Sequence, residues 1–181
     1  MYVCRHMYTW FEIVSVDKSN IVAALKNGKS PVLVPGGVAE VTYLPDAKRK
    51  KECVLYLSAR LGFVKIALKN NVPIIPVFCF GLQNTYTFWV PENKLIHKIG
   101  RMIGFLPMVF KGMWGIPFGP ARPCDYTNVV GSPIPFDKCV GDEPSSDEIA
   151  SYHAKYITAL RALFDKHKSS CGMENVTLRI V

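Results

Sequence analysis

A single carboxylate, Glu40, stands three residues after the glycine pair Gly36-Gly37. The apolar stretch 31–34 before the glycines is expected to form a buried strand, so the glycines mark its end and let the backbone approach a ligand closely. A carboxylate at the edge of a sheet can orient an imidazole or accept a hydrogen bond from a substrate hydroxyl. The alternative is that Glu40 begins a helix and satisfies free backbone amides there.

Two cations, Arg60 and Lys65, flank the start of a helix that the sequence predicts over residues 61–71. They are five positions apart, about 140° around a helix, so both can contact one ligand only if Arg60 lies before or within the first turn. In this helix Gly62, Lys65 and Lys69 share one face, and apolar residues occupy another.

The histidines and cysteines show no recognisable catalytic or metal-binding spacing. Each of the four histidines could act as a general base, but none lies in a Gly- or Pro-rich loop that would hold it rigidly, and we interpret all four as structural. The six cysteines lack zinc-site spacing and are expected to be reduced, in surroundings that face the cytosol. No Ser-His-Asp order, P-loop, HExxH or dinucleotide-binding GxGxxG is present. The histidines are His6, His97, His153 and His167.

Helices and strands alternate along the chain, which favours an α/β fold with a largely parallel sheet flanked by helices. In such sheets, functional groups gather where strands end in loops. The predicted elements are 17–27 (helix), 31–34 (strand), 61–71 (helix), 73–81 (strand) and 123–131 (strand).

A long helix is predicted to begin near Ser145, which can form a capping box with Glu148. An apolar stripe along it should pack inward, while Lys155, Lys166 and Lys168 remain in solvent. The stripe consists of Ile149, Tyr152, Tyr156, Leu160 and Leu163. The residues after Gly172 carry no clear pattern.

Residues 92–118 combine many apolar side chains with interspersed lysine and arginine and contain Trp114. Such a segment suits the interface of a membrane, and the alternative is a loop-rich part of the core. No run of 18 uninterrupted apolar residues occurs, so a helix that spans the bilayer within these residues is not expected.

Length and composition indicate one globular domain, because 181 residues can bury a sizeable core and a 49% hydrophobic, 20% charged chain is too apolar to be disordered. The formal net charge of +8 favours an anionic partner: nucleic acid, an acidic membrane surface or a phosphate-bearing substrate. The cations do not alternate with aromatic residues in any known nucleic-acid-binding arrangement, so we expect no nucleic-acid partner.

Five strings follow one another along the chain: Val34-Pro-Gly-Gly-Val-Ala-Glu40, Arg60-Leu-Gly-Phe-Val-Lys65, Ile75-Pro-Val-Phe-Cys-Phe-Gly81, Val129-Val-Gly-Ser-Pro-Ile134, and Tyr152-His-x-x-Tyr156 through Leu163-Phe-Asp-Lys-His-Lys168. Together they resemble the type-2 diacylglycerol acyltransferase family, whose relatives include monoacylglycerol and wax-ester acyltransferases. The resemblance runs from about Arg5 to Lys168. It implies a single acyltransferase domain over residues 1–181, corresponding to the C-terminal part of a glycerolipid-acyltransferase-like fold.

The resemblance implies transfer of a fatty acyl group from acyl-coenzyme A (acyl-CoA) to diacylglycerol or a related lipid alcohol, at the cytosolic face of the endoplasmic-reticulum membrane or on lipid droplets. Acyl-CoA is a co-substrate, and no cofactor is implied. Glu40 would orient the catalytic histidine or the acceptor, and Arg60 and Lys65 would bind coenzyme A phosphates. The other residues implied in substrate binding are Gly36, Gly37, Gly62, Phe63, Pro76, Phe80 and Gly81.

The sequence departs from the family pattern in one respect that bears on activity. The family's general base belongs to a His-Pro-His-Gly block, which these 181 residues do not contain. General-base catalysis contributes about 10²- to 10⁴-fold, so the chain alone is expected to be nearly inactive, as a truncated gene model would be. The alternatives are a non-catalytic lipid-binding or partner-binding fragment and a peripheral membrane protein held by residues 92–118. The acceptor, acyl length and oligomeric state stay open.

Overall fold

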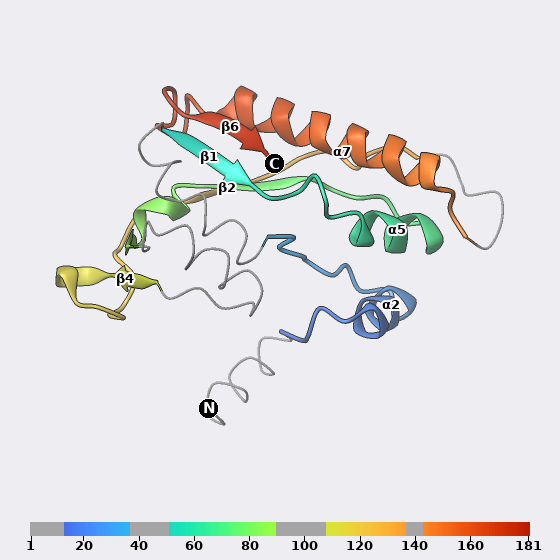
Figure 1. Cartoon of the computed structure of the whole chain (residues 1–181), viewed down its shortest axis with the longest axis horizontal. Coiled ribbons are helices and arrows are strands. Elements are labelled where there is room, and N and C mark those ends of the chain that lie inside the picture. Colours follow the sequence, from blue (N-terminus) through green and yellow to red (C-terminus); the bar gives the residue numbers. More distant parts are fainter. Residues whose placement is uncertain (1–12, 37–50, 90–107, 137–142) are drawn as a thin grey trace, which may run out of the picture.

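The computed structural model describes residues 13–36, 51–89, 108–136 and 143–181. Figure 1 shows the long helix α7 running along one side, with the strands β1, β6 and β2 beside it and the short helix α5 next to its N-terminal half. The described helices are α2 (Lys18–Lys26), α5 (Gly62–Lys69) and α7 (Ser146–His167), with 3-10 turns η1 (Leu82–Asn84) and η2 (Met113–Gly115). The described strands are β1 (Glu52–Leu55), β2 (Val77–Phe80), β3 (Thr87–Trp89), β4 (Val109–Lys111), β5 (Thr127–Val130) and β6 (Thr177–Ile180).

The fold is mixed α/β, but the expectation of a largely parallel sheet is wrong for the described residues. The strands there form three separate pairs, of which β1–β6 is parallel and β2–β5 and β3–β4 are antiparallel. The β2–β5 pairing continues beyond the strands, because Gly131 N–H donates to Pro76 O (2.8 Å) and Ile134 N–H donates to Ile74 O (2.9 Å). An apolar run in a sequence indicates a strand but not its direction, which explains the error.

The helices α2 and α5 begin and end close to the predicted bounds, and α7 begins where it was predicted to. Asp17 occupies the N-cap position of α2 and Gly28 follows it with a positive φ of 69°. The capping box of α7 is formed: Glu148 N–H donates to Ser145 Oγ (3.2 Å) and Ser145 N–H donates to the Glu148 carboxylate (2.7 Å). The bond donated by Ser145 N–H stabilises the ionised carboxylate and lowers the pKa of Glu148 below its ordinary value.

The buried strand expected over residues 31–34 is wrong. The segment is irregular, and the side chains of Val32 and Val34 are each 89% exposed. Prolines at positions 31 and 35 bound it and have no N–H to donate to a neighbouring strand. Apolar composition alone therefore does not place this segment in a sheet.

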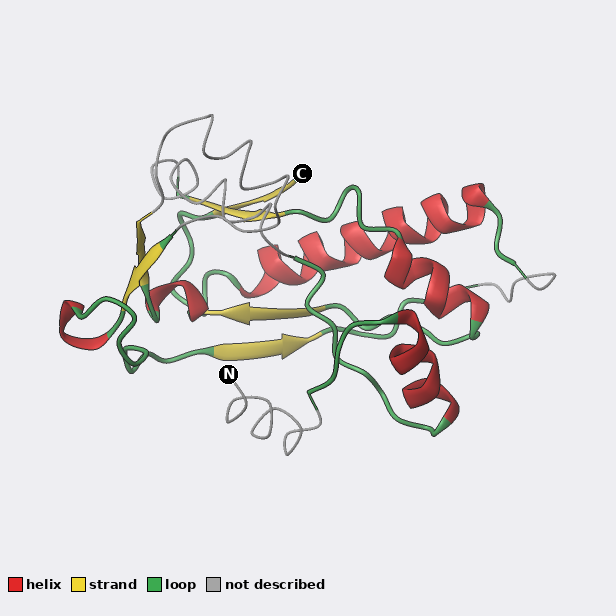
Figure 2. Ribbon diagram, turned by 60° about the horizontal axis from the view of Figure 1, so that its bottom comes forward, coloured by secondary structure: helices red, strands yellow, loops and turns green. Residues whose placement is uncertain are grey.

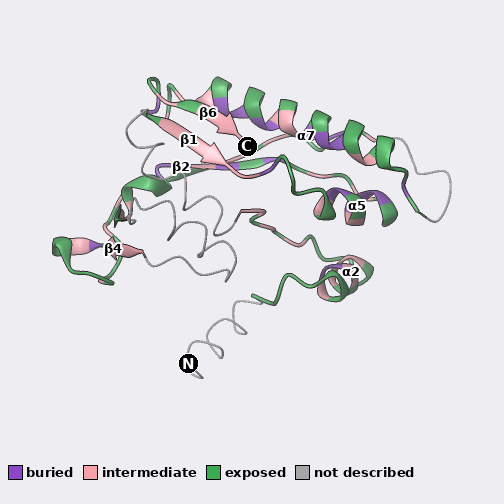
Figure 3. Cartoon of the chain, in the orientation of Figure 1, coloured by how far each residue is buried: buried purple, intermediate pink, exposed green. Residues whose placement is uncertain are grey.

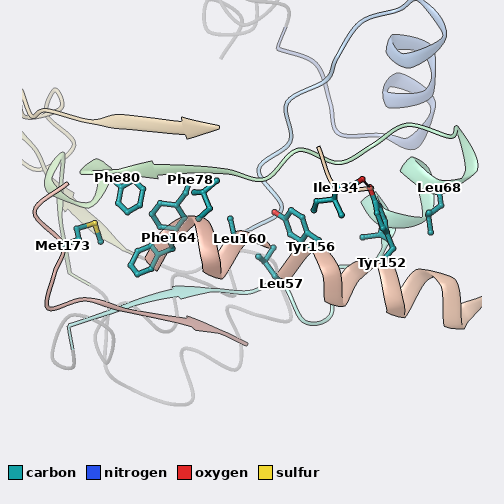
Figure 4. Close-up of a cluster of buried hydrophobic side chains, with 12 residues drawn as sticks. Leu57, Leu68, Phe78, Phe80, Ile134, Tyr152, Tyr156, Leu160, Phe164 and Met173 are labelled. Atoms are coloured by element: carbon teal, nitrogen blue, oxygen red, sulfur yellow. Dashed lines mark hydrogen bonds between the residues drawn. The ribbon is translucent and has the colours of Figure 1, made fainter. Parts of the chain in front are cut away.

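The core lies between α7 and the strand β2. Figure 4 shows the aromatic side chains of β2 and the C-terminal half of α7 facing one another: the rings of Phe80 and Phe164 stack with centroids 5.6 Å apart, and Phe78 meets Phe164 edge-on at 5.0 Å. The buried residues of α7 appear as separate purple patches along the helix in Figure 3, and they include Tyr152, Tyr156 and Leu160, as predicted.

The residues after α7 form a strand that belongs to the fold. In Figure 2 the chain returns from the end of α7 to form β6, which pairs with β1 from Glu52 opposite Thr177 to Leu55 opposite Ile180. In the described ranges no helix combines the length and the apolar character that crossing a membrane requires.

Candidate functional site

The helix α5 presents cations on one side because its other side is buried. Val64, Ala67 and Leu68 are buried at helical spacing, and Lys65 and Lys69, one turn apart, are exposed. Burial of three apolar side chains at this spacing fixes the rotation of the helix. The two ammonium groups therefore stand on a rigid element rather than on a loop.

Arg60 lies before the first turn of α5, which is the position that the spacing requires if it is to share a ligand with Lys65. Its guanidinium carbon lies 5.6 Å from the centroid of the Tyr56 ring, a cation–π contact. The turn that carries it is held by its own backbone, because Arg60 N–H donates to Leu57 O (2.9 Å). Gly62 and Arg60 are both exposed, and Phe63 is half-buried.

Lys65 and Lys69 converge on one carboxylate, that of Glu143, which lies just before α7. Lys65 Nζ is 3.1 Å from Oε2 of Glu143, and Lys69 Nζ contacts the other oxygen, Oε1. Hydrogen bonds from Lys69 and then Lys65 lower the pKa of Glu143 from 4.5 to about 2. The carboxylate is therefore ionised at neutral pH, and each of its oxygens has its own ammonium group.

Tyr152 joins two backbone segments that carry family strings. Its hydroxyl accepts a hydrogen bond from Ile74 N–H (3.0 Å) and donates one to Ile134 O (3.0 Å). Burial raises the pKa of the Tyr152 phenol, so it stays protonated and can donate. Tyr152 thus ties α7 to the place where the β2 and β5 segments meet.

His153 ties α7 to the turn before α5. It is a buried polar residue, 7% exposed, and its Nε2 lies 3.1 Å from Leu57 O, so Nε2 carries the proton that this carbonyl accepts. Phe63 packs edge-on against both neighbours on α7, with ring centroids 6.4 Å from His153 and 5.2 Å from Tyr156. The contact of His153 with Leu57 O was not predicted from the sequence, although the Tyr-His-x-x-Tyr spacing is a usable signal.

The family string that ends at Gly81 contributes buried residues on and beside the strand β2. Pro76 and Phe80 are fully buried, and a Cβ on Gly81, whose φ is +86°, would lie 2.3 Å from Asp125 O. Only glycine fits this close approach of two backbones. The structure gives these three residues packing roles, and their contact with substrate stays a prediction.

The sequence-predicted residues are only partly brought together. Arg60, Gly62, Phe63 and Lys65 share the start of α5, and Gly36 lies on another segment, where it is partly buried. Glu40 and Gly37 lie outside the described residues, so a cleft shared by Glu40, Arg60 and Lys65 stays a prediction. Glu143 was not among the predicted site residues, because no motif marks it.

Part of the predicted interfacial segment is described, from residue 108 to 118. Its aromatic side chains Trp114 and Phe118 are 79% and 64% exposed, and Trp89 on the paired strand β3 is 61% exposed. Trp114 and Phe118 both have a φ of 57°, unusual for bulky residues. Residues 92–107 lie outside the described ranges.

The described residues contain no cluster of three or more His, Cys, Asp or Glu side chains that could hold a metal ion. Four cysteines lie in these ranges, and no two of them are joined by a disulfide: Cys53, Cys79, Cys124 and Cys171.

Comparison with known proteins extends these observations. A profile described as diacylglycerol acyltransferase matches residues 1–181. Acyl-CoA wax alcohol acyltransferase 2 of Homo sapiens is 35% identical over 184 residues, covering 92% of this chain and 52% of that protein. Diacylglycerol O-acyltransferase 2 of Danio rerio is 34% identical over 185 residues, covering 93% and 48%. A third relative, 2-acylglycerol O-acyltransferase 3 of Homo sapiens, is 34% identical over 161 residues, covering 81% of this chain and 44% of that protein. The chain therefore spans about half the length of the curated relatives it matches.

No solved structure matches the chain.

Proposed function

Since the chain belongs to the diacylglycerol acyltransferase family, we propose that it forms the acyl-CoA-binding part of an O-acyltransferase that makes triacylglycerol from diacylglycerol. One observation carries this proposal: the family string from Arg60 to Lys65 places exposed cations on and just before a helix whose other side is buried. Coenzyme A carries several phosphate charges, and charge-assisted hydrogen bonds from fixed cations bind such groups well.

The proposed reaction is attack of the diacylglycerol hydroxyl on the thioester carbonyl of acyl-CoA. The new ester C–O bond forms and the C–S bond breaks, while a general base takes the hydroxyl proton and passes it to the leaving sulfur, so that coenzyme A leaves as the thiol. By resemblance the base is a histidine of a His-Pro-His-Gly block, which does not occur in these 181 residues. Glu40 would orient that histidine or the acceptor, and Gly36 and Gly37 would let backbone amides approach the reacting carbonyl.

Specific residues of the α5 region take proposed roles in binding the donor. Arg60 and Lys65 bind the phosphates, while Gly62, which is exposed and has no side chain, leaves room for them. Phe63, Pro76, Phe80 and Gly81 support this arrangement from the buried side. The buried contacts of Phe63 with α7 favour this role, because they fix the start of α5.

A membrane surface is the proposed location of the reaction. The exposed aromatic residues Trp89, Trp114 and Phe118 support it, because aromatic side chains prefer the boundary between headgroups and acyl chains. We place the protein at the cytosolic face of the endoplasmic reticulum or on lipid droplets, where both substrates dissolve. Binding to liposomes that high salt reverses only partly is the expected result. Absence of liposome binding would remove the membrane part of the proposal.

A second candidate function is a non-catalytic lipid-binding or partner-binding fragment. The missing His-Pro-His-Gly block favours it, because the chain would keep its cations and apolar surface without the base. This candidate predicts acyl-CoA binding without acyl transfer.

Acyl transfer to defined acceptors tests both candidates. Labelled oleoyl-CoA is incubated with diacylglycerol, a 2-acylglycerol or a long-chain alcohol, and with the chain alone or co-expressed with the N-terminal half of Danio rerio diacylglycerol O-acyltransferase 2. Triacylglycerol formed only with the supplied half supports the acyltransferase. Acyl-CoA binding without transfer in either arm supports the fragment, and absence of both binding and transfer refutes both.

A further inference from the structure

The anion that occupies Lys65 and Lys69 in this structure is part of the chain itself. Glu143 is separated from Lys69 by 74 positions in the sequence, yet its two carboxylate oxygens each contact one of the two ammonium groups. A phosphate group likewise presents pairs of oxygens to neighbouring cations. The Glu143 carboxylate therefore fills the place that an anionic ligand would take.

The three side chains are exposed enough to exchange partners. Their side-chain exposed fractions are 49% for Lys65, 38% for Lys69 and 53% for Glu143. Exposed ion pairs are weak, and each shifts an equilibrium by at most about fivefold. A ligand with several phosphates can therefore displace this carboxylate, which a buried pair would not allow.

The positions of the two lysines do not depend on Glu143. Val64, Ala67 and Leu68 anchor α5, so the ammonium groups stay one turn apart when the carboxylate leaves. Glu143 lies two residues before the N-cap of α7, in the segment that leads into this helix. The carboxylate and the lysines therefore belong to different elements and can separate.

We infer that Lys65 and Lys69 together form a phosphate subsite for coenzyme A, and that Glu143 competes with the coenzyme for it. This inference rests on the proposed function, and it adds Lys69 and an internal competitor to the donor site. Glu143 lowers the affinity for coenzyme A, and it offsets one of the two lysine charges when no donor is bound.

Affinity for coenzyme A, measured by calorimetry at low ionic strength, tests the inference. Glu143→Gln should lower the Kd about three- to tenfold, because it removes two exposed ion pairs that must break on binding. The matched control is Asp165→Asn, which removes the same charge and the Asp165–Lys168 pair on α7. It should change the Kd less than twofold. In a Lys65→Gln/Lys69→Gln background, Glu143→Gln should have no effect.

Each result supports or overturns the inference. It is overturned if Glu143→Gln leaves the Kd unchanged, if Asp165→Asn tightens binding equally, or if the effect persists without the two lysines. Wild-type protein that binds coenzyme A while Glu143→Gln has no effect refutes the competitor and leaves the proposed function standing. Failure of every variant to bind coenzyme A refutes the proposed function itself. Phosphatidylserine vesicles form a second arm: tighter vesicle binding by Glu143→Gln with an unchanged Kd for coenzyme A would assign the subsite to a lipid headgroup.

Discussion

Removing the hydroxyl of Tyr152 tests how much its two hydrogen bonds, from α7 to the backbone at Ile74 and Ile134, stabilise the fold. Tyr152→Phe keeps the ring and its edge-on contact with Phe136, whose centroid is 5.7 Å away. It deletes the hydrogen bond accepted from Ile74 N–H and the one donated to Ile134 O, both 3.0 Å. Both backbone groups would then lose the partner that the hydroxyl provides, in a place where water does not replace it, because Tyr152 is only 3% exposed.

The expected loss follows from these two bonds. A buried hydrogen bond contributes about 1 kcal/mol net, and an unsatisfied group costs about 1–3 kcal/mol. The free energy of unfolding should therefore fall by about 2–4 kcal/mol. For a chain of this size that corresponds to a Tm lowered by roughly 4–16 °C.

The assay is urea unfolding followed by far-UV circular dichroism, with Tyr156→Phe as the matched control. Tyr156 is buried one turn further along α7, and no hydrogen bond of its hydroxyl is found among the described residues. Its phenylalanine variant should change the free energy of unfolding by less than about 1 kcal/mol. Equal effects of the two substitutions, or a Tyr152→Phe effect below about 0.5 kcal/mol, would refute the tethering role.

Three further predictions concern other residues of the site. Gly81→Ala should lower the free energy of unfolding by at least about 1–3 kcal/mol in urea titrations, because its φ of +86° and its approach to Asp125 O exclude a Cβ; a variant as stable as wild type would contradict this. His153→Phe should cost about 1–2 kcal/mol by the same measurement, and His153→Gln should restore part of it by donating to Leu57 O; equal losses would argue against the hydrogen bond. The pKa of Glu143 is lowered from 4.5 to about 2, so its contribution to stability is complete above pH 4.5 and is lost as the pH falls through 2. Glu143→Gln should therefore flatten the acid limb of a Tm–pH curve over that range, and an unchanged curve would contradict the ion pairs.

Local patterns predicted the helices well because their signals lie within a few residues. The capping box of Ser145 and Glu148 and the 3.6-residue spacing of Val64 and Leu68 depend only on neighbouring positions. The position of Arg60 before the first turn of α5 followed from the same geometry. These features need no knowledge of distant contacts.

Pairings between distant segments could not be predicted in the same way. The direction of β5 against β2 and the pairing of β6 with β1 depend on how the chain returns after many residues. The contact of Glu143 with Lys65 has the same origin, and nothing in the residues around Glu143 indicates it. The buried role of His153 was open to prediction only in part, because a histidine in a helix does not reveal which carbonyl it will meet.

Because α7 is long, a small rotation about one end displaces its other end by a large distance. Its 22 residues form a rod of about 33 Å, anchored near one tip by the stacked rings of Phe80 and Phe164. Swinging the rod by about 5° around Phe164 would displace its N-terminal tip, about 27 Å away, by roughly 2 Å, enough to break an ion pair. The hydrogen bonds of Tyr152 and His153 hold α7 nearer that tip. They resist such a swing and keep the segment that carries Glu143 in place.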